Sequence, residues 1–196
     1  MKNLTLSRLS TALLTLFVSA AAAHGKVYLT QDEALRLAFG DDASLEHQSI
    51  FLTETQLARS RQLAGPKVEI ASALITRYVG SRNGKALGCA YFDTHRVRTL
   101  QETLMVVVSP DGRVLRTDVL SFGEPPEYLP KKGWLLQFRG RELDAELTIK
   151  RGIHGITGAT ISADAALTAV RRILAIHRAV DLEPTKRVGP GEASAR

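Results

Sequence analysis

The sequence predicts an α+β fold, in which a mainly antiparallel sheet carries flanking helices. The first observation is a hairpin at 102–122, where Asp111-Gly112 joins two runs rich in β-branched residues. The second is an apolar helical period over about 162–179, after the β-rich middle of the chain. The third is that the β-rich runs follow one another across short turns, which pairs strands antiparallel.

Residues 1–23 are typical of a secretory signal peptide. Lys2 and Arg8 form a basic start, and residues 9–23 then carry no charge and end in small side chains. Cleavage is expected after Ala23. An uncleaved anchor is the alternative, but the uncharged run is shorter than the about 20 residues of a membrane span. The mature protein is therefore expected in the periplasm.

The stretch after the signal predicts a short amphipathic helix at 31–39. Thr30 is the expected N-cap, and Glu33 stands at the capping-box position three residues later. Gly40 is expected to end the helix, because glycine adopts the backbone conformation of a helix C-terminus without strain.

A second short helix is expected to start at Thr53 or Thr55 and to end at Gly65. Residues 68–80 have strand composition. We therefore expect residues 24–80 to form an N-terminal extension of helices and strand.

The β-rich middle continues with a strand at 86–93 and then the hairpin. Residues 123–133 hold three prolines and two glycines, which is typical of a stiff irregular loop. A short apolar segment follows at 134–138, and 142–150 is expected to be another strand. The last helix, at about 162–179, leads to a tail at 181–196 that lacks apolar periodicity and is expected to be flexible.

Composition excludes several classes of function. The net charge of +6 is scattered, without the basic blocks of a nucleic-acid-binding protein, so no nucleic-acid partner is expected. The single cysteine, Cys89, excludes an internal disulfide, a c-type haem site and a cysteine-ligated iron–sulfur cluster. The histidines lack metal-ligand spacing, so no metal site is expected.

The segment TGATIS at 157–162 stands where the last helix begins. Helix N-termini attract anions through free N–H groups and the helix dipole. Gly158 and Ala159 leave the backbone open to close approach, and Thr160 and Ser162 can cap the helix. Three side chains upstream can contribute positive charge: Lys150, Arg151 and His154. The segment therefore suits a phosphate; a tight turn with an N-cap is the alternative.

The motif T-G-A-T resembles the S/T-G-A-T signature of FMN-binding domains. These occur in the C subunit of sodium-pumping NADH:quinone reductases, in the G subunit of Rnf complexes and in small exported flavoproteins. The resemblance implies that Thr160 is esterified to the phosphate of FMN by a separate flavin transferase, and that Thr157, Gly158 and Ala159 complete the motif. The following Ile161 and Ser162 are carried with it as cofactor-binding candidates. The resemblance also implies an FMN-binding domain at 81–180.

The resemblance extends upstream to the loop at 123–133. In the family, a Glu-Thr-Pro-Gly-type loop approaches the flavin ring, and Glu124, Tyr128 and Trp134 are the corresponding candidates here. Their alternatives are a solvated glutamate, a loop-packing tyrosine and a core tryptophan. The chain departs from the family at His154, where an aspartate is usual, and His154 is a candidate contact of the phosphate or an exposed loop residue.

Three functions follow from these observations. The first is an exported flavoprotein with covalent FMN that transfers electrons between membrane-bound and extracytoplasmic redox partners; such a protein is an electron carrier more than a stand-alone enzyme and needs no acid–base catalytic residue. The second is a non-catalytic module that binds FMN or another phosphate ligand in sensing or assembly. The third is a structural exported domain in which TGATIS only caps a helix.

Overall fold

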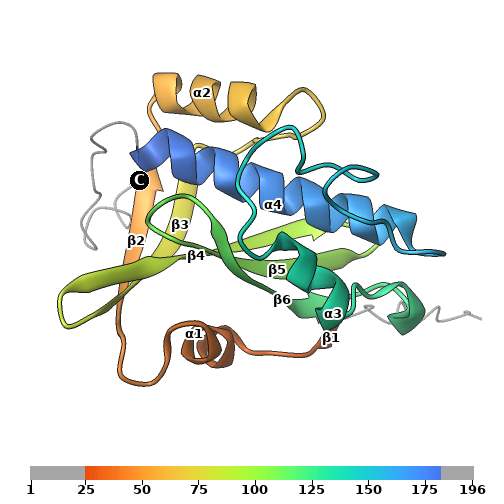
Figure 1. The fold of residues 1–196 in the computed structure, drawn as a ribbon, viewed down its shortest axis with the longest axis horizontal. Coiled ribbons are helices and arrows are strands. Elements are labelled where there is room, and N and C mark those ends of the chain that lie inside the picture. Colours follow the sequence, from red (N-terminus) through yellow and green to blue (C-terminus); the bar gives the residue numbers. More distant parts are fainter. Residues whose placement is uncertain (1–24, 182–196) are drawn as a thin grey trace, which may run out of the picture.

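The computed structural model describes residues 25–181, which form one sheet with helices on both of its faces (Figure 1). The expected signal peptide at 1–23 and, apart from Asp181, the expected tail at 181–196 lie outside the described residues. Within the described range, no helix has the length and apolar character needed to cross a membrane.

The sheet has six strands in the order β1-β6-β5-β4-β3-β2, and each pair of neighbours is antiparallel. The expected α+β class with an antiparallel sheet is confirmed. The strands are β1 (Lys26–Val27), β2 (Ser44–Phe51), β3 (Leu74–Arg82), β4 (Lys85–Arg96), β5 (Gln101–Val108) and β6 (Val114–Phe122).

Helices cover the two faces of the sheet unequally. In Figure 1 the long α4 runs across one face with α2 beyond it, while α1 lies against the opposite face. The helices are α1 (Gln31–Phe39), α2 (Glu54–Ala64), the single turns η1 (Pro126–Tyr128), α3 (Lys132–Leu135) and η2 (Leu136–Phe138), and α4 (Thr160–Asp181).

Alternation along β5 explains why the sheet has two cores. Leu104 and Val106 face α4, where they pack with helix residues such as Val170, whereas Met105 and Val107 face α1. All four strand side chains are at most 1% exposed. Burial of such a side chain stabilises the fold by about 1.5–3 kcal/mol, so the central strands fix both helices in place.

The first two helices begin and end as the sequence predicts. Thr30 accepts a hydrogen bond from the backbone N–H three residues later (3.3 Å), and Thr53 does the same in α2 (3.1 Å); both are complete capping boxes. The structure thus selects Thr53 over Thr55 as the start of α2. Gly40 (φ +85°) and Gly65 (φ +89°) end the helices in the left-handed region that favours glycine.

The predicted strand at 142–150 is wrong. Asp144 accepts hydrogen bonds from the backbone N–H groups of Glu146 (2.9 Å) and Leu147 (3.0 Å), which folds the chain into a turn. The single β contact there is an isolated bridge between Ile149 and Ile153.

The edge of the sheet also differs from expectation. β2 was not predicted, because its run SLEHQSIF is polar for most of its length. The predicted strand at 68–80 starts later, at Leu74, because Val68 and Ile70 instead pack in the core between α2 and the end of α4.

A buried polar network fastens α4 to β4. Arg172 of α4 contacts both carboxylate oxygens of Asp93 (2.8 and 2.7 Å), and His95 joins Asp93 (2.9 Å) to Glu102 of β5 (3.1 Å). Burial alone lowers the pKa of His95, but its hydrogen bonds to the two carboxylates outweigh burial and raise the pKa to about 9. The network therefore pairs the side chains of Arg172 and His95 with the carboxylates of Asp93 and Glu102 where α4 packs on the sheet.

Candidate functional site

The start of α4 builds one wall of the candidate site. The carbonyl of Ala159 accepts the first helical hydrogen bond, from Ala163 N–H (3.1 Å), so the helix opens at Thr160 and not at the predicted Ser162. The expected capping role of Thr160 is therefore wrong, because Ala159 takes the N-cap position. Gly158 has φ +79°, and a Cβ built there would meet no atom within 4 Å. The loop needs glycine for its conformation and leaves open space in front of it.

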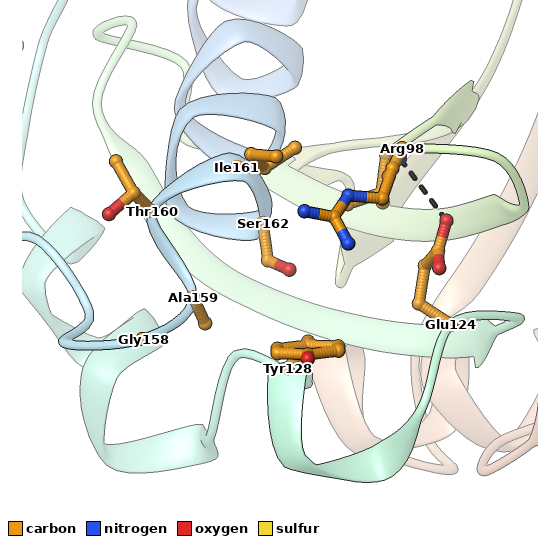
Figure 2. A pocket seen from close by; sticks show the side chains of 9 residues that line it. Arg98, Glu124, Tyr128, Gly158, Ala159, Thr160, Ile161 and Ser162 are labelled. Atoms are coloured by element: carbon orange, nitrogen blue, oxygen red, sulfur yellow. Dashed lines mark hydrogen bonds between the residues drawn. The ribbon is translucent and has the colours of Figure 1, made fainter.

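A cavity of about 260 Å³ lies against this helix start (Figure 2). It joins the TGATIS segment to the Pro-rich loop, which ends 24 residues before Thr157. Its lining residues are Val97, Arg98, Glu124, Tyr128, Gly158, Ala159, Thr160, Ile161 and Ser162. Of the sequence-based candidates, Thr157, Trp134 and His154 are outside this lining, and Val97 and Arg98 were not predicted.

Glu124 is 9% exposed, and its carboxylate holds the β4–β5 connection. One carboxylate oxygen accepts from the backbone N–H groups of Leu100 (2.8 Å), Thr99 (2.6 Å) and Arg98 (3.2 Å), and from the Thr99 hydroxyl (3.2 Å). The hydrogen bonds from Leu100 and Thr99 are the main cause that lowers the pKa of Glu124. Glu124 is thus not the solvated residue of the alternative.

Arg98 brings a positive charge to the cavity. In Figure 2 its guanidinium points away from Glu124 toward Ser162 at the start of α4. Within residues 25–181 no carboxylate lies at ion-pair distance from this guanidinium. Sequence reasoning missed Arg98 because it appeared as one of many scattered cations, five residues beyond the predicted strand at 86–93.

Tyr128 closes the other side of the cavity. The turn η1 orients it, and the Tyr128 N–H donates to the carbonyl of Pro125 (3.0 Å). Figure 2 shows its ring facing the space below Arg98 and Ser162. The cavity is thus enclosed by an aromatic ring, a guanidinium and the first turn of a helix.

Trp134 and His154 meet outside the cavity. The indole Nε1 of Trp134 donates to the carbonyl of His154 (2.7 Å), and the His154 N–H donates to the side-chain oxygen of Gln137 (2.9 Å). The ring of Trp134 packs edge-on against Phe138, with centroids 5.3 Å apart. These two candidates therefore fix the segment that leads into TGATIS, and the exposed Thr157 continues that segment.

Thr160 stands between two cavities. It also lines a larger one of about 690 Å³, where two exposed lysines, Lys67 and Lys150, take part in the lining. In Figure 2 the Thr160 side chain points away from Arg98 and Tyr128. Lys150 adopts φ +71°, an uncommon conformation for a side-chain-bearing residue. Positive charge therefore reaches Thr160 from the lysines and from the helix dipole, while the exposed Asp164 adds one carboxylate to the same lining.

The charges around Thr160 and Arg98 suit an anionic ligand. Among the residues that line the smaller cavity, Glu124 is the one carboxylate, and one of its two oxygens accepts the hydrogen bonds from the β4–β5 connection. The Thr160 side chain points away from this cavity (Figure 2), and the exposed carboxylate of Asp164 lines the larger cavity together with Thr160. The site is suited to hold a ligand with a negative charge and a planar part.

Comparison with models of protein families gives one finding: residues 101–175 match the FMN-binding domain. The match contains β5, β6, the Pro-rich loop, TGATIS and most of α4. Comparisons with curated proteins and with solved structures returned no match to this chain.

Proposed function

Since residues 101–175 belong to the FMN-binding domain family and FMN is the cofactor of that domain, we propose that this protein is an exported flavoprotein with FMN attached covalently to Thr160. In this proposal it carries electrons between membrane-bound and extracytoplasmic redox partners. The observation that carries it is the position of Thr160, at the mouth of a cavity that the Pro-rich loop and the first turn of α4 form together.

The residues present fit FMN. The first turn of α4 and the lysines near Thr160 suit the phosphate. Arg98 and the ring of Tyr128 suit a planar heteroaromatic system with carbonyl acceptors. The volume of about 260 Å³ is below the about 300–1,000 Å³ of most small-molecule sites, so the smaller cavity takes only part of the cofactor. A partly open site favours electron exchange with a partner.

When bound, FMN supplies reversible electron transfer, and the chain binds and orients it. Attachment by a separate flavin transferase is part of this proposal, as the resemblance of the T-G-A-T motif implies. Condensing a hydroxyl with free FMN in water is unfavourable, so we infer an activated donor in which the FMN phosphate is part of a diphosphate. A bond would form between Thr160 Oγ and the FMN phosphorus, the P–O bond of the diphosphate bridge would break with the second phosphate leaving as a phosphate monoester, and the hydroxyl proton would pass to solvent.

Export is the second element of the proposal. Residues 1–23 have the composition of a signal peptide, and a protein outside the cytoplasm cannot replace a cofactor that diffuses away. A covalent ester prevents this loss of the cofactor by diffusion. The proposed location is the periplasm, and the proposed partners are the transferase and the redox proteins on either side of the carrier.

The test is expression of the full chain with a flavin transferase in a host that exports it. After denaturation, flavin colour is expected to stay with the polypeptide, and peptide mass mapping is expected to find FMN on the fragment that contains Thr160. Thr160→Ala is expected to abolish attachment, whereas the control Thr55→Ala, at an exposed threonine of α2, keeps it.

A colourless denatured chain beside an active transferase would refute covalent attachment. Flavin retained by Thr160→Ala would refute the assignment of the acceptor. Reduction of the attached flavin by a membrane fraction with an added reductant distinguishes an electron carrier from a sensory or assembly module, which would not cycle.

A further inference from the structure

Arg98 differs from the arginines that hold the fold together. Arg172 is paired with Asp93, and Arg77 lies 3.3 Å from Asp181. The guanidinium of Arg98 has no such carboxylate within residues 25–181, although it lines a cavity. A cation that projects into a cavity without a protein counter-charge favours a ligand that carries, or gains, negative charge there.

The position of Arg98 is held by the fold. Three consecutive N–H groups, from Arg98 to Leu100, donate to the Glu124 carboxylate, and the Val97 N–H donates to the carbonyl of Leu100 (3.0 Å). The backbone under Arg98 is therefore fixed from two sides, while its side chain extends away from Glu124 (Figure 2). The fold thus places the Arg98 backbone beside the cavity and leaves its exposed guanidinium accessible to a ligand.

The neighbouring lysines indicate which part of the cofactor Arg98 faces. Thr160 points away from Arg98, and Lys67 and Lys150 line the larger cavity on its other side. A phosphoryl group on the Thr160 oxygen thus has the lysines and the helix N-terminus as its positive partners. Arg98 shares its cavity with the ring of Tyr128, so the group that Arg98 faces is the flavin ring and not the phosphate.

Resting on the proposed function, we propose that Arg98 sets the redox potential of the bound flavin, because its guanidinium contacts the isoalloxazine ring. A neutral oxidised ring that takes up two electrons and one proton carries one negative charge. A fixed cation beside the ring favours that charged state and raises the midpoint potential. Electron donors of correspondingly higher potential can then reduce the protein.

The test uses the full chain, loaded with flavin by a transferase in an exporting host. Its midpoint potential is measured without oxygen, with dithionite as reductant and a dye of known potential as reference. Arg98→Gln is expected to lower the equilibrium constant for two-electron reduction about tenfold, a shift of about 30 mV. Arg98→Lys, which keeps the charge, is expected to retain most of the wild-type potential. The matched control is Arg96→Gln, at an exposed arginine two residues away that does not line the cavity.

The outcomes separate this inference from the function on which it rests. Equal potentials for Arg98→Gln and Arg96→Gln overturn it, and so does an Arg98→Lys potential as low as that of Arg98→Gln. Loss of flavin in Arg98→Gln alone also overturns it, because Arg98 would then serve attachment. A wild-type chain that never carries flavin overturns the proposed function, and this inference with it.

Discussion

The indole Nε1 of Trp134 donates a hydrogen bond across 2.7 Å to the main-chain carbonyl of His154. Together with the bond from the His154 N–H to Gln137, it ties both polar groups of one peptide segment to the helical turns at 132–138. The loop that presents TGATIS is therefore supported from a distance, by side chains that do not touch the cavity.

Trp134→Phe removes the donor and keeps an aromatic ring against Phe138. We expect a loss of about 1 kcal/mol in the free energy of unfolding, the usual contribution of one hydrogen bond. Urea unfolding of the flavin-free chain measures it. The control is Leu136→Ala, at a side chain that is 59% exposed, for which a change below about 0.5 kcal/mol is expected. Equal losses in the two variants would show that the bond contributes nothing.

Glu124→Gln weakens the anchor of the β4–β5 connection, because a neutral amide accepts hydrogen bonds less strongly than a carboxylate. Faster amide exchange is expected at Thr99 and Leu100, measured by NMR. Glu127→Gln, on the same loop but exposed, is expected to leave these amides unchanged.

In the wild type, the protection of the Thr99 and Leu100 amides against exchange is expected to decrease in acid. The pKa of Glu124 is lower in the folded state, so its contribution is present above the usual pKa of a glutamate. It is lost as pH falls through the folded pKa. Protection factors of the Thr99 and Leu100 amides that stay the same on acidification would contradict this assignment.

His95 is expected to make the fold less stable in mild alkali. Its pKa rises from 6.5 to about 9 on folding, so its contribution is complete below pH 6.5 and is lost as pH rises through about 9. His177 acts in the same direction: burial opposes its charge, but Asp181 and Cys89 outweigh burial and raise its pKa to about 9.

Melting temperatures between pH 6 and pH 9.5 test this dependence. The melting temperature of the wild type is expected to fall with rising pH, that of His95→Gln less, and that of the double variant with His177→Gln least. If the melting temperature of His95→Gln fell with pH as steeply as that of the wild type, the pH dependence would belong to other groups.

Gly80→Ala is expected to destabilise the face of the sheet that α1 covers. A Cβ at Gly80 would overlap the ring of Phe39, which is 4% exposed. Overpacking of this kind costs about 1–3 kcal/mol. Thermal unfolding measures it, with Gly133→Ala in α3 as control: a Cβ there meets no atom within 4 Å, and a neutral or slightly favourable change is expected. A neutral Gly80→Ala would mean that the ring of Phe39 moves aside freely.

The parts of the fold that local chemistry determines could be predicted from the sequence. Threonine caps set the starts of α1 and α2, and Asp111-Gly112 joins β5 to β6. The strand at 142–150 failed because the Asp144 side chain binds the backbone N–H groups that a neighbouring strand would need.

The site shows the same division. The meeting of Glu124 and Tyr128 with the start of α4 followed from the resemblance, since the motif residues were recognisable by type and order. Arg98 was not, because nothing in its neighbours distinguishes it from Arg96. Only the packing of the β4–β5 connection against Glu124 directs one of these two arginines into the cavity.

The order of strands sets a limit on how this flavin segment can be transplanted. Residues 101–175 begin at β5, which lies inside the sheet because β4, encoded upstream, pairs with it from Cys89↔Val108 to Arg96↔Gln101. Cut out alone, the segment would turn β5 into a bare edge that invites aggregation. It would also lose Arg98. Residues 101–175, which match the family model, are therefore not enough for a chimera, which must also contain β4 and Arg98.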